Sequence, residues 1–293
     1  MNADGLSRRA RAVFAASALA IVASGCAEPF DKDTQVSAPG DEINVIDQSN
    51  LNELMLTISD PEDAVAYFRK TLNEQPDRLD IKRGYGLSLA RARRYADAAR
   101  VFEELAQAGA ADDELRVEYA HALARLERWP EAENQMALVS TGLQAPRRHL
   151  IDAMLADHRS DWTGADAAYE RARSLSANPA TILNNWGVSR MSRGEYKAAQ
   201  RTFEEAVAHN PRLFSIKNNL AVSRALQGEY RLPLVSISAE ERATMLHNVG
   251  IIALRRGDRE EAKGLFTMAV ETHPRYYPAA AEKLAALDAV VVN

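Results

Sequence analysis

Residues 183–211 read LNNWGVSRMSRGEYKAAQRTFEEAVAHNP, and this stretch decides the fold class. Its apolar and small residues recur every three or four positions in two runs separated by a Gly-Glu step, which is typical of two amphipathic helices joined by a short turn. Small side chains at Gly187 and Ala199 allow the two helices to approach closely, and Phe203 fills the space under the next pair. Pro211 ends the second helix. The stretch therefore predicts an antiparallel helix pair.

The same pattern returns along the chain with a fixed period. A step from Ala to a bulky residue four positions later occurs six times, at intervals of 34, 34, 33, 34 and 63 residues. The last interval equals one repeat of 34 residues plus one of 29. Unrelated amphipathic helices would drift out of phase, so the chain is predicted to be a repeat array. The steps are Ala64/Phe68, Ala98/Phe102, Ala132/Met136, Ala165/Tyr169, Ala199/Phe203 and Ala262/Phe266.

This pattern resembles that of the tetratricopeptide repeat, a helix–turn–helix unit of about 34 residues. The resemblance implies an all-α fold, a tetratricopeptide-repeat solenoid of about seven helix pairs over residues 45–276. Residues 277–293 are expected to form a C-terminal capping helix that covers the apolar face of the last repeat.

Two repeats depart from the pattern. The first carries Asn52 where a small residue is expected, so we expect its first helix to be frayed or incomplete. The sixth, at about 214–242, is five residues short and carries Pro233 where Ala is expected. Its second helix, near 231–237, should therefore be one irregular turn. We interpret this as a tolerated deletion in a scaffold, and the alternative is a bend that shapes a binding surface.

The amino terminus resembles a bacterial lipoprotein signal. Three arginines precede an uncharged run at 12–25 that is too short to span a bilayer and ends at Cys26, the only cysteine of the chain. The small residues before Cys26 resemble a lipobox, although Ala23 stands where Leu is usual. We expect a signal peptide at 1–25, lipidation of Cys26 and a flexible polar tether at 26–44. An ordinary signal peptide with an incidental cysteine is the alternative.

Composition and motifs argue against several function classes. Lys and Arg number 36 against 41 Asp and Glu, for a net charge of −5, which lacks the basic footprint of a nucleic-acid-binding protein. One cysteine and six scattered histidines indicate neither a disulfide framework nor a metal site. The sequence contains no Gly-x-Ser-x-Gly elbow and no phosphate-cradling glycine loop. It therefore predicts no catalytic residues, metal, cofactor, small-molecule substrate or nucleic-acid partner.

The groove lined by the first helices of the repeats is the predicted functional surface. Its floor is apolar, with Asn and His at the edges, and suits an amphipathic or extended segment of a partner protein. The alternative is that some of these apolar side chains belong to the core between repeats. With repeats counted from Leu79, Asp113, Ala180, Phe214 and Ala243, the early groove residues include Arg83, Leu87, Val117 and His121. The predicted partner-binding residues are Asn184, Val188, Met191, Asn218, Val222, Leu226, His247, Ile251 and Leu254.

The carboxylate-clamp repeats that hold chaperone tails offer a comparison for this groove. They use Lys and Asn at the fifth and ninth positions of the opening repeat. In this chain the ninth positions are apolar, namely Leu87, Val188, Val222 and Ile251. We therefore expect that clamp to be absent.

The chain as a whole resembles the TadD-like lipoproteins of the Tad (tight adherence) system. The resemblance rests on the lipoprotein signal, the acidic tether, residues 183–188 (LNNWGV), residues 217–221 (KNNLA) and the Tyr230-x-x-Pro233 step. It implies a non-enzymatic lipoprotein that binds a protein partner, an outer-membrane secretin or another Tad component, and assists assembly of Flp-type pili as a pilotin.

The same resemblance implies attachment to the outer membrane, on its periplasmic face, through the N-terminal lipid. Ala27 follows the cysteine, where Asp would favour retention in the inner membrane. PilF-like type IV pilotins and the BamD component of the barrel-assembly machine share this architecture. The alternatives are therefore an assembly lipoprotein of that kind, or an adaptor that recruits envelope enzymes such as peptidoglycan hydrolases or proteases.

Overall fold

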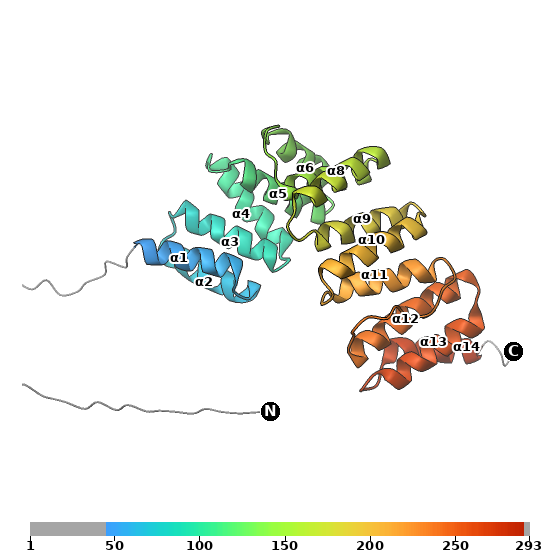
Figure 1. Ribbon diagram of the computed structural model, residues 1–293. Coiled ribbons are helices and arrows are strands. Elements are labelled where there is room, and N and C mark those ends of the chain that lie inside the picture. Colours follow the sequence, from blue (N-terminus) through green and yellow to red (C-terminus); the bar gives the residue numbers. More distant parts are fainter. Residues whose placement is uncertain (1–44, 290–293) are drawn as a thin grey trace, which may run out of the picture. The chain divides into compact units, whose positions relative to one another are not determined.

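The structure, a computed structural model, describes residues 45–289, and every regular element among them is an α-helix (Figure 1). From α2 onwards, helices adjacent in the chain contact each other, and the short turns that join most of them make the partners antiparallel. This confirms the predicted all-α class. The helices are α1 (Val45–Thr57), α2 (Pro61–Glu74), α3 (Leu79–Arg91), α4 (Tyr95–Gln107), α5 (Asp113–Arg125), α6 (Trp129–Ala137), α7 (Pro146–His158), α8 (Trp162–Leu175), α9 (Ala180–Ser192), α10 (Tyr196–His209), α11 (Phe214–Ala225), α12 (Ala239–Arg256), α13 (Arg259–Thr272) and α14 (Pro278–Ala289).

Within residues 45–289, six repeats contain two helices each, and one contains a single helix. The first helices are α1, α3, α5, α7, α9, α11 and α12, and the second helices are α2, α4, α6, α8, α10 and α13. Helix α14 packs on α13 after the last repeat. No helix in the described part of the chain is both long and apolar enough to cross a bilayer. The signal peptide, Cys26 and the tether lie outside the described residues.

The register counted from the sequence agrees with where the first helices begin. Helices α3, α5, α9 and α11 begin at the counted first positions Leu79, Asp113, Ala180 and Phe214. Helix α12 begins four residues before Ala243, at Ala239. The earlier start has a local cause, because the side chain of Ser238 and that of Glu241 form a reciprocal capping box.

Contact between a glycine and a phenylalanine sets the close approach within a repeat. A Cβ atom added to Gly187 would lie 2.5 Å from Cε1 of Phe203, so only glycine fits at this crossing. Phe203 thus packs on the first helix of its own repeat. It also belongs to the buried cluster that contains Ile216 and Leu220 of α11, so it fills the space under the next repeat as well. The equivalent pairs are Gly86/Phe102 and Gly250/Phe266.

The first helix of the array is formed, and the expectation of a frayed or incomplete helix was wrong. Asn52 of α1 finds a partner in α2, where the hydroxyl of Tyr67 donates to its Oδ1 at 2.9 Å. Arg91 of α3 also donates to the backbone oxygens of Met55 and Ser59, both at 2.9 Å. Because these polar groups are satisfied by the neighbouring helices, a polar residue at the small-residue position is tolerated.

The sixth repeat has no second helix. Residues 226–238 contain turns, bends and extended chain only, so irregular chain stands where a full second helix would be, as expected from the sequence. Tyr230, Leu232 and Ile237 pack against the core of α12 and α13 in place of a helix. Lys217 of α11 is 3% exposed and donates to the backbone oxygen of Ser236 at 2.9 Å. The segment is therefore held in place by its apolar side chains, which pack on the core, and by the hydrogen bond from the buried ammonium of Lys217.

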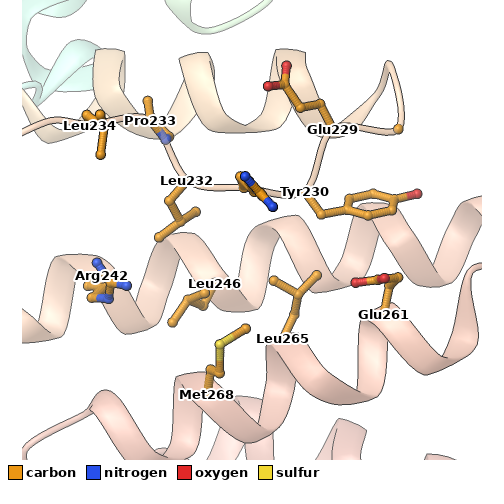
Figure 2. Close-up of a pocket in the computed structure, with 12 residues that line it drawn as sticks. Glu229, Tyr230, Leu232, Pro233, Leu234, Arg242, Leu246, Glu261, Leu265 and Met268 are labelled. Carbon is orange, nitrogen blue, oxygen red and sulfur yellow. The ribbon is translucent and has the colours of Figure 1, made fainter.

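A cavity of about 760 Å³ lies where the missing helix leaves room. Figure 2 shows Leu232 of the extended segment above Leu246, with Leu265 and Met268 facing the same space. Leu234 of the same segment is fully exposed. The deletion therefore does more than shorten the chain, because it leaves Met268 of α13 exposed beside the cavity, while Leu246 and Leu265 stay buried.

Candidate functional site

Three connected cavities follow the first helices of the array. Their volumes are about 280, 240 and 420 Å³. The first two share Leu87, Glu118 and Arg147, and the last two share Ala90, Arg91 and Arg147, so they form one continuous groove. We call it the first-helix groove. Helices α1, α3, α5, α7, α9 and α11 supply most of its lining, and Tyr95 is the only residue from a second helix.

The predicted groove residues divide into two groups. Arg83, Leu87, Val117 and His121 of the early repeats line the cavities. Of the nine predicted partner-binding residues, Asn184 lines the largest of the three. The other eight line none of these cavities. They lie further along the array on α9, α11 and α12 or just after α11: Val188, Met191, Asn218, Val222, Leu226, His247, Ile251 and Leu254.

Asparagine side chains connect the first helices of three consecutive repeats. Nδ2 of Asn219 donates to Oδ1 of Asn184 at 3.0 Å, and Nδ2 of Asn248 donates to Oδ1 of Asn218 at 2.8 Å. Asn184 and Asn218 thus use their amide oxygens to hold neighbouring helices together, which leaves their NH₂ groups for a ligand. Asparagine recurs at the sixth position of all three repeats and at the fifth position of the first two, which was the sequence signal for these hydrogen bonds.

The apolar residues of the later repeats are only partly available to a partner. Val188 is 40% exposed, and Val222 is half-buried. Met191 packs against the core of α7 to α11, and Ile251 and Leu254 pack against the core of α12 and α13. The open part of the predicted strip therefore centres on Val188 and Val222, while the other three also serve the core between repeats.

His247 occupies a packed position. Its ring centroid lies 5.7 Å from that of Phe266 and 5.7 Å from that of Tyr277. Its Nε2 is buried and has no hydrogen-bond partner among the described residues. His247 was predicted to bind a partner at the edge of the groove, but its ring is packed among aromatic side chains. Its Nδ1 lies 3.4 Å from Oδ1 of Asn248.

A network of charged and polar side chains crosses the middle of the groove. Nη2 of Arg147 donates to Glu118 at 2.9 Å and to Nδ1 of His121 at 3.0 Å. Burial, helped by the positive charges of Arg147 and Arg125, lowers the pKa of His121 to about 3. His121 is therefore neutral at physiological pH, and its Nδ1 is an acceptor. The guanidinium of Arg125 lies over the ring of Tyr95, 5.4 Å from its centroid.

Sequence reasoning did not single out the arginines of this region. Arg91 and Arg125 both stand at the thirteenth position of their repeats, counted from Leu79 and Asp113. Their recurrence there was the signal that could have found them. Arg147 has no such signal, because its repeat was not assigned a first position. Within residues 45–289, no three His, Cys, Asp or Glu side chains are grouped so that they could hold a metal ion.

Comparisons with known proteins place the fold. The tetratricopeptide-repeat family model matches residues 56–114 and 184–231. The chain is similar in structure to the APC/C hetero-tetramer Cut9–Hcn1, with a TM-score of 0.53 and 13% identity over 82% of this chain and 47% of that chain. The present chain thus covers about half the length of that chain. A tetratricopeptide repeat protein from Parabacteroides merdae matches with a TM-score of 0.50 and 12% identity over 83% and 98% of the two chains.

A more distant match is PilF of Pseudomonas aeruginosa, with a TM-score of 0.41 and 11% identity over 61% of this chain and 90% of that chain. A search of curated proteins finds no significant match. The two likenesses with TM-scores of 0.53 and 0.50 show the fold alone, which is that of a tetratricopeptide-repeat solenoid.

Proposed function

We propose that this repeat array is a non-enzymatic, lipid-anchored scaffold that binds a partner protein in the first-helix groove and assists assembly of a Tad/Flp pilus. The groove itself is the observation that supports binding. It runs across the first helices of six repeats and combines apolar side chains with amide and guanidinium donors. Such a surface fits an extended or helical segment, whose apolar side chains it buries and whose backbone groups it satisfies.

The Tad role and the outer-membrane location are supported by the sequence. The lipobox-like residues before Cys26, the acidic tether and the asparagine-rich first helices resemble those of TadD-like lipoproteins. The partner in that role is the outer-membrane secretin, which the scaffold helps to assemble on the periplasmic face.

Anchoring is tested by Cys26→Ser. We expect the variant to lose incorporation of labelled palmitate and to leave the outer-membrane fraction, because a mature lipoprotein is held by several acyl chains and one chain alone binds only marginally. Fractionation of the unaltered protein is the second arm of this experiment. A mature protein found wholly with the inner membrane would contradict the proposed location.

Partner binding is tested by replacing Val188 and Val222 together with Glu. These side chains lie on adjacent first helices and are the open part of the apolar strip. Two added carboxylates should weaken capture of the secretin and reduce piliation at least tenfold, because a few central apolar contacts carry most of the affinity of such interfaces. Circular dichroism should show unchanged helicity.

Leu175→Glu is the matched control, since Leu175 is a similarly exposed apolar residue at the end of the second helix α8. It should bind and assemble normally. A folded Val188→Glu/Val222→Glu protein that still captures the secretin and supports piliation would contradict partner binding on the exposed side of α9 and α11. If the double variant loses a bound peptidoglycan hydrolase and keeps the secretin, the adaptor function is favoured.

A further inference from the structure

The largest cavity of the first-helix groove carries positive charge without any carboxylate in its lining. Arg91, Arg93, Arg125 and Arg147 line it, and none of its lining residues is Asp or Glu. The whole chain has a net charge of −5, so the charge of this cavity is opposite in sign to that of the protein. Among the described residues, only Arg147 of these four has a carboxylate partner, Glu118, which lines the neighbouring cavities instead.

The other three guanidinium groups are placed without acidic partners in the described part of the chain. Arg91 donates to two backbone oxygens, Arg125 lies over the ring of Tyr95, and Arg93 is exposed in the turn after α3. Several arginines outside this cavity do pair with acids. Arg83 bonds Asp112 at 2.7 Å, and Arg173 bonds Glu170 at 2.8 Å and Glu205 at 2.9 Å. No Asp or Glu lines this cavity, so its guanidinium groups meet no carboxylate within the lining itself.

The remaining lining suits a polypeptide. Leu150 and Ile216 form a buried apolar floor, while Asn185 and Ser215 contribute an amide and a hydroxyl. The side chain of Asn185 has no hydrogen bond to another described residue, unlike Asn184 beside it. Amide and hydroxyl groups next to an apolar floor can bond the backbone of an extended segment.

We propose that the partner segment that enters this cavity is acidic, an extended stretch with at least two carboxylates that pair with Arg93, Arg125 and Arg147. This deepens the proposed function and rests on it, because it assumes that the groove binds a protein. Guanidinium groups pair carboxylates through two parallel hydrogen bonds, which gives both strength and orientation. The groups come from successive repeats, so they are spaced along the groove and favour a chain of carboxylates over a single compact anion.

The test uses the purified, lipidated full chain in detergent and a random twelve-residue peptide library displayed on phage. Enriched peptides are labelled with fluorescein, and their Kd is measured by fluorescence polarisation. We expect the enriched peptides to carry two or more Asp or Glu residues and to bind more weakly as NaCl rises from about 0.05 to 0.5 M.

Arg93→Gln/Arg125→Gln is the test variant, because neither side chain makes a hydrogen bond within the described residues and the fold should be kept. It should raise the Kd about tenfold or more, the loss expected when charged hydrogen bonds are removed. Arg100→Gln, which removes one positive charge from the exposed side of α4, is the control and should leave the Kd unchanged. A thermal melt of each variant shows that the fold is kept.

Each other result contradicts the inference in a distinct way. Neutral or basic peptides, or no enrichment at all, would show that the cavity does not select acids. If acidic peptides bind the test variant as tightly as the unaltered chain, their binding site lies outside this cavity. Self-association that the test variant abolishes would make a second copy of the chain the occupant. If Val188→Glu/Val222→Glu weakens secretin capture and the arginine variant does not, the proposed function stands and this inference fails.

Discussion

Gly187→Leu is expected to lower the free energy of unfolding by about 1–3 kcal/mol or more, the range for overpacking a close-packed core. The cause is geometric. Even a Cβ atom at Gly187 would lie 2.5 Å from Cε1 of Phe203, a ring that is fully buried and cannot move aside without disturbing the next repeat. Urea denaturation followed by circular dichroism measures the loss.

Two further variants separate this cause from a general effect of removing a glycine. Gly264 lies in α13, and a Cβ there would meet nothing within 4 Å, so Gly264→Ala should keep or raise the stability by up to about 1 kcal/mol. Phe203→Leu should recover part of the loss when combined with Gly187→Leu, because it makes room at the crossing. Unchanged stability of Gly187→Leu would mean that the repeat register is wrong.

Glu241→Gln is expected to cost roughly 3 kcal/mol, the lower end of the range for breaking a buried ion pair. Lys217 is almost completely buried, and its ammonium lies 3.1 Å from the carboxylate of Glu241. The lower end applies because Glu241 itself is partly exposed. Glutamine keeps an oxygen for the capping contact with the backbone of Ser238, so the change removes mainly the charge. Urea denaturation gives the free energy.

The controls for this pair come from the same chain. Lys217→Met/Glu241→Gln should recover most of the loss, since it also removes the buried charge that the single variant leaves unpaired. Asp288→Asn breaks the exposed pair of Lys263 and Asp288 and should cost less than about 1 kcal/mol. Equal losses for Glu241→Gln and Asp288→Asn would show that Lys217 does not hold the helix-free segment as described.

The fold could be predicted from the sequence because its repeat is local. The Ala-to-bulky steps and the small residues of the first helices recur with one period, and each reports on packing within about 34 residues. The formation of α1 could not be predicted in the same way. Asn52 looks unsuitable at a small-residue position, and its satisfaction depends on the hydroxyl of Tyr67 in another helix. That pairing follows from the folded geometry and from no local pattern.

The sequence predicted where the groove lies better than it predicted which side chains are open and what they bond. Counting repeat positions placed Arg83, Leu87, Val117, His121 and Asn184 on the groove, where the cavities have them. The counting could not show which of the later residues remain open, because packing between repeats decides that. Nor could it show that Asn184 and Asn218 each bond a residue of the next repeat. Side-chain partners on different repeats are set by the relative placement of helices, which periodicity alone does not give.

A photo-crosslinking amino acid placed at Val188, and separately at Ala167, tests most directly whether the first helices carry the binding surface. Val188 is on α9, four residues and so about one turn from Asn184, which lines the groove, and Ala167 is an exposed residue of the second helix α8. In cells, irradiation is expected to give one specific protein adduct at Val188 and none at Ala167. A specific adduct at Ala167 with none at Val188 would contradict binding in the groove.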